Sequence, residues 1–260
     1  MPGEWAGTAD AYARSFALLC AGAVDAVLDA VAERTPPPAS LLDVGTGPGT
    51  LARAAAARGW DAEACDPEPG MVALAVRDGV RVREAGLPHL PWADRAADAV
   101  CANFVVNHTT HPRDAIVELA RVARGTVAFT IWPRRRTVLN GLWSGVVADA
   151  EARPVPGATL PPEDDIDRSE EGLAAVLGDL GLAHVRVTTL EWDFAIAPAA
   201  LWSGVEDGAG TIGTTYRAQD AAARARMAAA YRARTAELVA DDGLLHLPSF
   251  GLLALASAAG

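Results

Sequence analysis

Short apolar runs and amphipathic segments alternate along the first half of the chain. Runs typical of strands occur at residues 41–44, 60–65, 80–84, 98–106 and 126–131. Helical patterns occur between them, at residues 52–58, 69–78 and 112–123. This alternation predicts an α/β fold with a parallel sheet and right-handed crossovers. The run 98–106 is expected to be a central strand buried on both faces, and 80–84, which alternates with charges, a strand near an edge.

A leading helix is expected before the sheet begins. Apolar residues recur at helical spacing through residues 8–33, and the proline run at 36–38 ends the pattern. At this position the helix can serve as a lid. Its aromatic residues are Trp5, Tyr12 and Phe16, which either pack the helix down or contact a ligand.

The second half of the chain departs from simple alternation. The expected elements are helices at 138–150, 169–180 and, for the most part, 198–241, with strands at 184–194 and within 243–256. Ser169 is expected to be an N-cap, and Pro248 indicates a sheet edge or a bulge. A helical segment of about 40 residues between the last two strands is most simply a cap on the substrate side.

The densest group of glycines follows the first predicted strand, between Asp43 and Thr50. Gly45, Gly47 and Gly49 lack a Cβ atom, so the backbone can take positive φ and approach a ligand closely. Thr50 is expected to be the N-cap of the next helix, whose free N–H groups and positive dipole end would face that ligand. The segment therefore predicts a nucleotide-type cradle.

An acidic residue stands at the end of the second predicted strand. Asp66 follows Gly45 by about 20 positions, the separation at which an acidic residue holds ribose hydroxyls in α/β nucleotide folds. Ligands of such folds lie at the carboxyl ends of the parallel strands. The segments expected to meet there are 43–49, 66, 86–87, 103–108 and 131–132.

The composition narrows the classes of partner. The 260 residues carry a formal net charge of −11, which disfavours binding to nucleic acid, and the cluster Arg134-Arg135-Arg136 is interpreted as a solvated loop. The three cysteines, too few for a disulfide framework or a zinc site, fit a reducing cytoplasm. Neither a signal peptide, a membrane span nor metal-ligand spacing is apparent, so we expect a cytoplasmic protein without a metal.

The glycine spacing distinguishes between nucleotides. A dinucleotide fingerprint is G-x-G-x-x-G, whereas the pattern here is G-x-G-x-G with Thr50 at the last fingerprint position. A P-loop is excluded because no Gly-Lys-Ser/Thr follows. Asp43 would repel a pyrophosphate but suits the positive end of a zwitterionic cofactor.

These residues resemble the class I S-adenosylmethionine-dependent methyltransferases. Five segments carry the resemblance: 43–49 (the glycine motif), 66–67 (the acidic position), 90–92 with 97–100 (the "LPF…FDAV" segment), 103–111 (the stretch after the fourth strand) and 121–125 (the "RVL…GG" turn). The resemblance covers residues 10–132 closely and the remainder through the order of elements.

The resemblance implies a fold and a cofactor. The fold is a Rossmann-like, doubly wound, seven-stranded, mostly parallel sheet with the last strand antiparallel. It forms one domain, 1–260, with a helical lid (1–38), a cofactor-binding half (39–133) and a C-terminal half (134–260) with a helical cap at about 197–242. The cofactor is S-adenosyl-L-methionine, with S-adenosyl-L-homocysteine as product. The implied cofactor-binding residues are Asp43, Gly45, Thr46, Gly47, Pro48, Gly49, Asp66, Pro67, Met71, Gly86, Leu87, Asn103 and Phe104.

Two positions depart from the family pattern. Family members often read the adenine amino group with an acidic residue where this chain has Gly86, although the backbone of Leu87 can still bind the ring. The phenylalanine of the "FDAV" segment is replaced by Ala97.

Histidine and aromatic residues are the candidates for binding the methyl acceptor and removing its proton. Methyl transfer is an in-line displacement, and a hydroxyl or ammonium acceptor also needs a base, for which His108 is the candidate. His108 alternatively caps a helix or shapes the pocket, and His111 is interpreted as structural. The candidate substrate-binding residues are Trp5, Tyr12, Phe16, Asn107, His108, Trp132, Trp143 and Trp202.

The leading hypothesis is therefore a methyltransferase that acts on a small aromatic or apolar metabolite, as in secondary metabolism. The acceptor atom is carbon, nitrogen or oxygen. The protein is expected to be a monomer or a homodimer. Two alternatives stay open: a catalytically silent S-adenosylmethionine-binding partner or scaffold, and an NAD-dependent oxidoreductase, against which Thr50 argues.

Overall fold

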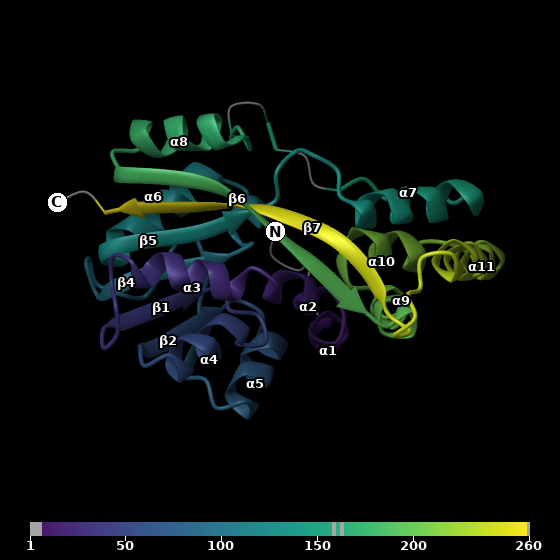
Figure 1. The fold of residues 1–260 in the computed structure, drawn as a ribbon, viewed down its shortest axis with the longest axis horizontal. Coiled ribbons are helices and arrows are strands. Elements are labelled where there is room, and N and C mark those ends of the chain that lie inside the picture. The colour runs from purple at the N-terminus through teal and green to yellow at the C-terminus, as the bar shows by residue number, and fades with distance from the viewer. Residues whose placement is uncertain (1–6, 158–159, 162–163, 259–260) are drawn as a thin grey trace.

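A seven-stranded sheet runs through the protein, whose computed structural model describes residues 7–157, 160–161 and 164–258 (Figure 1). The strands are β1 (Ser40–Val44), β2 (Asp61–Asp66), β3 (Val82–Glu84), β4 (Ala97–Asn103), β5 (Ala123–Ile131), β6 (Ala183–Ile196) and β7 (Leu245–Ser257). Their spatial order is β3-β2-β1-β4-β5-β7-β6. Strands β1 to β5 pair in parallel, and β7 is antiparallel to both β5 and β6. The predicted Rossmann-like sheet with an antiparallel last strand is confirmed.

The central strand β4 is shorter than its apolar run predicts. It pairs with β1 and β5, as expected for a central strand, but ends at Asn103. Phe104 takes a φ of 58°, and the chain then forms the 3₁₀ turn η1 (Val106–His108). Hydrophobicity continues past the strand because Phe104 and Val106 are themselves buried in this turn. A run of apolar residues therefore could not mark where the strand stops.

Helices cover the two faces of the sheet with separate cores. They are α3 (Val24–Ala32) and α4 (Thr50–Ala57) on one face, and α6 (Pro112–Val122) and α8 (Glu170–Asp179) on the other. Successive strand residues point in opposite directions, so Val100 and Val127 pack with the α6 and α8 side, whereas Cys101 and Ala128 pack with α3 and α4. Helix α5 (Pro69–Arg77) packs beside β2 and β3.

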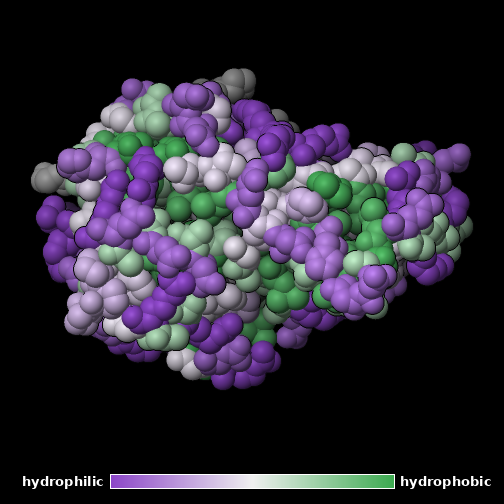
Figure 2. Space-filling view, viewed as in Figure 1, coloured by the Kyte–Doolittle hydropathy of each residue, from purple (hydrophilic) through white to green (hydrophobic). Residues whose placement is uncertain are grey.

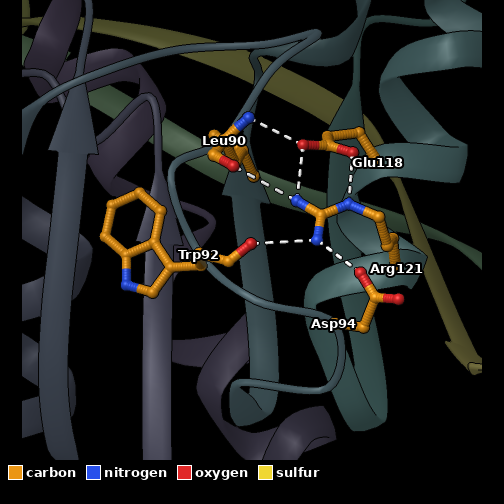
Figure 3. A network of polar contacts seen from close by, with 5 residues as sticks. All are labelled: Leu90, Trp92, Asp94, Glu118 and Arg121. Atoms are coloured by element: carbon orange, nitrogen blue, oxygen red, sulfur yellow. Dashed lines mark hydrogen bonds and ion pairs between the residues drawn. The ribbon is translucent and has the colours of Figure 1, made fainter.

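The loop between β3 and β4 is fastened to α6 by Arg121 (Figure 3). The Nε and Nη2 atoms of Arg121 each donate to Glu118 at 2.8 Å, and Nη1 donates to Asp94 at 2.7 Å and to the Trp92 carbonyl at 2.9 Å. Glu118 also accepts the Leu90 N–H at 2.7 Å. Hydrogen bonding to Arg121 lowers the pKa of Glu118. The pair thereby fixes a loop that reaches the carboxyl edge of the sheet.

A helical cap stands on the extended ends of β6 and β7 (Figure 1). Its helices are α7 (Val138–Asp149), α9 (Pro198–Glu206), α10 (Gly210–Arg217) and α11 (Ala221–Ala236). Helices α9 to α11 lie between the last two strands in sequence, as expected. Pro248 lies opposite Asp193 of β6, on the part of β7 that precedes the pairing with β5, which begins at Leu252. This stretch has β6 on one side only, and such an edge position is where a strand tolerates proline.

The surface over these elements carries both hydrophilic and hydrophobic residues. Figure 2 shows hydrophilic residues around the periphery of this face and hydrophobic side chains mainly toward its middle, over the sheet and the base of the cap. In the described parts of the chain, every helix is too short or too polar to cross a membrane.

The prediction of a single lid helix over 8–33 is wrong, because the segment divides into three helices: α1 (Ala9–Ala13), α2 (Phe16–Ala21) and α3. At the first break the buried Ser15 hydroxyl donates to the Ala11 carbonyl at 2.6 Å, and Ser15 leaves helical geometry with φ −130° and ψ −91°. At the second break Gly22 lies against Trp192, where a Cβ atom would be 2.1 Å from the indole Cδ1 atom. Apolar spacing continues through both breaks, so periodicity did not reveal them.

Replacing Gly22 with alanine should destabilise the protein by about 1–3 kcal/mol, because the added methyl group displaces the Trp192 ring from a packed site. Gly141→Ala is the matched control. Gly141 lies within α7, and a Cβ atom there would have nothing within 4 Å, so its substitution should stabilise by about 0.5–1 kcal/mol. Urea unfolding followed by circular dichroism measures both changes. Equal effects of the two substitutions would contradict the steric role of Gly22.

Candidate active site

A cavity of ≈ 1140 Å³ lies at the carboxyl edge of the parallel strands, between the sheet and the cap. All five segments expected at this edge contribute lining residues, among them Gly45, Asp66, Leu87, Phe104 and Trp132. The remaining walls come from the lid and from α7 and α10. Parallel strands deliver their following loops to one edge, which explains why residues distant in sequence meet here.

The β1–α4 turn forms a cradle that only glycine fits. Gly45, Gly47 and Gly49 have φ values of 69°, 56° and 86°. A Cβ atom on Gly45 would lie 2.5 Å from the Val105 side chain. Gly49, rather than Thr50, is the N-cap of α4, so the N-cap prediction is wrong. A residue with positive φ is needed before the helix, and glycine meets that need without a side-chain cap.

Asp43 is buried beneath this turn. Its Oδ2 atom accepts hydrogen bonds from the Thr46 hydroxyl at 2.5 Å and from the Ala52 N–H at 3.1 Å, while its Oδ1 atom is buried without a hydrogen-bond partner. Burial raises the pKa of the Asp43 carboxyl to about 7. Asp43, Thr46 and Pro48 line a small pocket that shares Gly45 and Gly47 with the main cavity.

Asp66 lies at the carboxyl end of β2 and lines the main cavity, as expected. Its Oδ2 atom accepts the Gly47 N–H at 2.8 Å, and its Oδ1 atom accepts the Glu68 N–H at 2.9 Å. Burial raises the pKa of Asp66. Each oxygen retains a further lone pair, so the carboxylate is held by the backbone and can still accept from a ligand.

Most of the predicted cofactor residues line this end of the main cavity, whereas Gly49 lines neither the main cavity nor the small pocket. Those in the lining are Gly45, Gly47, Asp66, Pro67, Met71, Gly86, Leu87, Asn103 and Phe104. The Asn103 amide joins the lid to the sheet: Nδ2 donates to the Cys20 carbonyl at 3.0 Å, and Oδ1 accepts from the Thr130 hydroxyl at 2.7 Å.

Gly86 explains the departure from the family pattern at the adenine position. A Cβ atom on Gly86 would lie 3.0 Å from the Pro67 ring, so an acidic side chain has little room there. The neighbouring Leu87 lines the cavity. A ligand bound at this point would therefore meet main-chain and apolar groups.

Aromatic residues form much of the other end. Phe16, Trp132 and Trp143 line the cavity, together with Tyr12 and His108. Trp132 stacks on Phe104 with centroids 3.9 Å apart, and Trp143 stacks on Tyr231 at 5.6 Å. These contacts hold flat apolar surfaces in fixed positions.

Two candidate substrate residues, Trp202 and Asn107, lie outside the cavity lining. Trp202 lies in the cap core, where it stacks on Tyr231 at 4.7 Å, and is not among the lining residues. Asn107 is also outside the lining and accepts the Trp132 N–H at 3.4 Å. Trp5 lies outside the described residues.

The cavity includes residues that the sequence did not indicate. Arg134, Arg135 and Arg136 are exposed, as a solvated loop would be, yet all three line the cavity. His111, interpreted as structural, also lines it, and its Nδ1 atom lies 3.2 Å from Asp164 Oδ1. The position of the arginines depends on where α7 packs, and no sequence motif carries that information.

Comparisons with known proteins agree with this geometry. Residues 42–130 match the family model described as a methyltransferase domain. An uncharacterized methyltransferase of Mycobacterium sp. (strain JLS) is 33% identical over 109 residues, which cover 40% of this chain and 43% of that protein. The chain thus matches less than half the length of this relative.

Two solved structures share the fold across nearly the whole chain. A putative methyltransferase from an antibiotic biosynthesis pathway of Anabaena variabilis superposes with a TM-score of 0.56 and 16% identity, covering 90% of this chain and 96% of that one. A possible histamine N-methyltransferase from Thermotoga maritima gives a TM-score of 0.55 and 14% identity, covering 99% and 100%.

The sheet order and the glycine turn define a Rossmann-like α/β fold. Residues 42–130 more specifically match a methyltransferase domain, and the Thermotoga maritima protein that shares the fold is named a methyltransferase dependent on S-adenosylmethionine. The site fits this cofactor, since a turn of three positive-φ glycines exposes its backbone at the cavity and the buried Asp43 Oδ1 atom lacks a hydrogen-bond partner. Asp66 and the Leu87 backbone would hold its ribose and adenine.

Proposed function

We propose that this protein is an S-adenosylmethionine-dependent methyltransferase that acts on a small aromatic or apolar metabolite at carbon, nitrogen or oxygen. One observation carries the proposal: a single cavity joins the glycine turn and Asp66 to a wall of aromatic side chains under the cap. A cofactor and an acceptor can therefore meet in one enclosed space. Three free cysteines support a cytoplasmic location, as a secondary-metabolite enzyme would have.

The chain would contribute mainly positioning. Bound S-adenosylmethionine supplies a methyl group on a sulfonium centre. Asp66 would accept hydrogen bonds from the ribose hydroxyls, and Trp132 and Trp143 would orient a flat acceptor against it. The lid and cap would cover part of a ligand bound in the cavity. Such approximation can lower a barrier by several kcal/mol, on the order of 7–11 in the best intramolecular cases.

A hydroxyl or ammonium acceptor would also lose a proton, for which we assign His108. It ends η1 directly after β4 and lines the cavity. His111 is the competing base, because Asp164 can orient its ring through Nδ1. Each imidazole carries a ring nitrogen that could act as the proton acceptor.

The decisive first experiment compares melting temperatures with saturating S-adenosylhomocysteine and with saturating NAD. Stabilisation by S-adenosylhomocysteine alone is expected, because a ligand that binds only the native state raises its stability. Stabilisation by NAD alone would favour an oxidoreductase. Mass spectrometry of a metabolite panel incubated with S-adenosylmethionine then detects transfer. Binding without any methylated product would favour a silent binding protein.

Asp66→Asn should weaken S-adenosylhomocysteine binding about tenfold, because a neutral amide replaces a charged acceptor for the ribose hydroxyls. Asp61→Asn, at the exposed opposite end of β2, is the control and should bind normally. Isothermal titration calorimetry measures both. Equal affinity of the two variants would show that Asp66 does not contact the ligand.

A further inference from the structure

The two ends of the cavity carry opposite charge. Among the described lining residues the carboxylates are Asp66 and Glu68, both at the end of β2. Arg134, Arg135 and Arg136 line the other end, in the segment between β5 and α7. Three arginines at one end of a cavity stand out in a chain whose net charge is −11. They create a local positive field where the acceptor would lie.

Two of these arginines already have partners. Arg134 forms an ion pair with Asp165. Arg135 lies with its Cζ atom 3.7 Å from the centroid of the Phe250 ring, and its Nη2 atom is 3.8 Å from Glu191 Oε1. Their charges are therefore partly balanced within the protein.

Arg136 differs, because no carboxylate in the described parts of the chain pairs with it. Its Nη2 atom donates to the Ser144 hydroxyl, which in turn donates to the Asn140 carbonyl at 2.9 Å. The next residue, Thr137, forms a capping box with Asn140. The guanidinium thus lies beside Ser144 on the second turn of α7, and most of its N–H donors remain available.

Helix α7 presents two rows of side chains to the cavity. Arg136 at its entry, Asn140 and Ser144 are spaced four apart and form a polar row. Leu139, Trp143 and Val147 form a parallel apolar row, also at intervals of four, and all six residues line the cavity. A ligand lying along α7 would meet an apolar strip for its body and, beside that strip, the Arg136 guanidinium.

We propose that the methyl acceptor carries an anionic group, a carboxylate or a phosphate, on an aromatic or apolar body, and that Arg136 binds this group. The proposal rests on the proposed function and defines its substrate class. Guanidinium binds planar or tetrahedral oxyanions through paired N–H donors. The apolar row of α7 would hold the body of the acceptor.

The test uses calorimetry on protein saturated with S-adenosylhomocysteine. The probes are indole-3-acetate, its neutral partner indole-3-acetamide, and phenyl phosphate. Wild-type protein should bind at least one acid about tenfold more tightly than the amide, as expected for a charge-assisted pair. Preference for the acetate or for the phosphate identifies the oxyanion. Arg136→Gln should abolish the preference, and Arg136→Lys should restore part of it through charge alone.

The controls separate this proposal from the one it rests on. Arg232→Gln removes an exposed arginine of α11 outside the cavity lining and should keep the acid preference. Arg136→Gln should bind S-adenosylhomocysteine normally, and weaker binding would overturn the proposal by assigning Arg136 to the cofactor. It is also overturned if neither acid binds better than the amide, or if Arg136→Gln retains the preference. Failure of S-adenosylhomocysteine to bind, with the acid preference intact in the free protein, would instead contradict the methyltransferase function alone.

Discussion

The unfolding free energy of Asp43→Asn minus that of wild type should increase by about 3 kcal/mol as the pH rises from about 5 to about 8, in the absence of cofactor. The reason is the burial of the Asp43 carboxyl, whose pKa rises from 3.8 to about 7 on folding. Between these two values the native protein keeps a proton that the unfolded chain has released. Stability therefore falls as pH rises, and the full penalty, about 4 kcal/mol, is reached above about pH 7.

Asparagine imitates the protonated carboxyl, so the variant escapes this penalty. Its side-chain oxygen can still accept from the Thr46 hydroxyl and the Ala52 N–H. Urea unfolding of both proteins over a series of pH values measures the difference. Asp179→Asn, an exposed substitution at the end of α8, should show a difference that does not change with pH.

A pH-independent difference for Asp43→Asn would contradict the buried, protonated state of this carboxyl. The same variant should bind S-adenosylhomocysteine more weakly at high pH, because the ionised carboxylate would attract the positive end of the ligand. Stability and cofactor affinity would then change in opposite directions at one side chain.

His108→Ala should lower the turnover rate for a hydroxyl or ammonium acceptor by about 10²–10⁴-fold, the usual contribution of a general base. Affinity for S-adenosylhomocysteine should not change, because the predicted role of His108 is toward the acceptor. Single-turnover kinetics with a methyl acceptor found in the panel measures the rate. The variant should also lose the fall in rate toward acidic pH that protonation of a base produces.

His111→Ala is the matched comparison, since both histidines line the cavity. It should change the rate by less than about tenfold if His108 is the base. The reverse outcome, a large loss in His111→Ala and a small one in His108→Ala, would transfer the role to the histidine beside Asp164. If the acceptor is methylated at an unprotonated nitrogen, neither His108→Ala nor His111→Ala should change the turnover rate.

Local patterns predicted the sheet well because each strand carries its own signal. The apolar run before Gly45, Asp66 at the end of β2 and the alternating charges of β3 all fix position in the sheet from neighbouring residues alone. The glycine turn was equally readable, since its φ values require glycine. The residues that could be predicted from local sequence therefore form most of the cofactor side of the cavity.

The acceptor side was less predictable because it depends on packing between distant elements. Trp143 and Trp202 have similar sequence surroundings, yet Trp143 lines the cavity while Trp202 stacks in the cap core. Gly22 interrupts the lid because Trp192, far along the chain, occupies the space beside it. The arginines at 134–136 acquire their role only from the placement of α7.

The pairing of Ile196 with Leu245 has a consequence for how acceptor preference can change. The chain leaves β6 and re-enters β7 at directly opposed residues, which in paired strands lie about 5 Å apart. Everything between these two points, including α9 to α11, is one contiguous segment with adjacent junctions. Such a segment can be exchanged for that of a relative without altering the register of the sheet or the glycine turn. Diversification of the acceptor pocket can thus proceed by replacement at a single site in the chain, while the half that holds the cofactor is inherited unchanged.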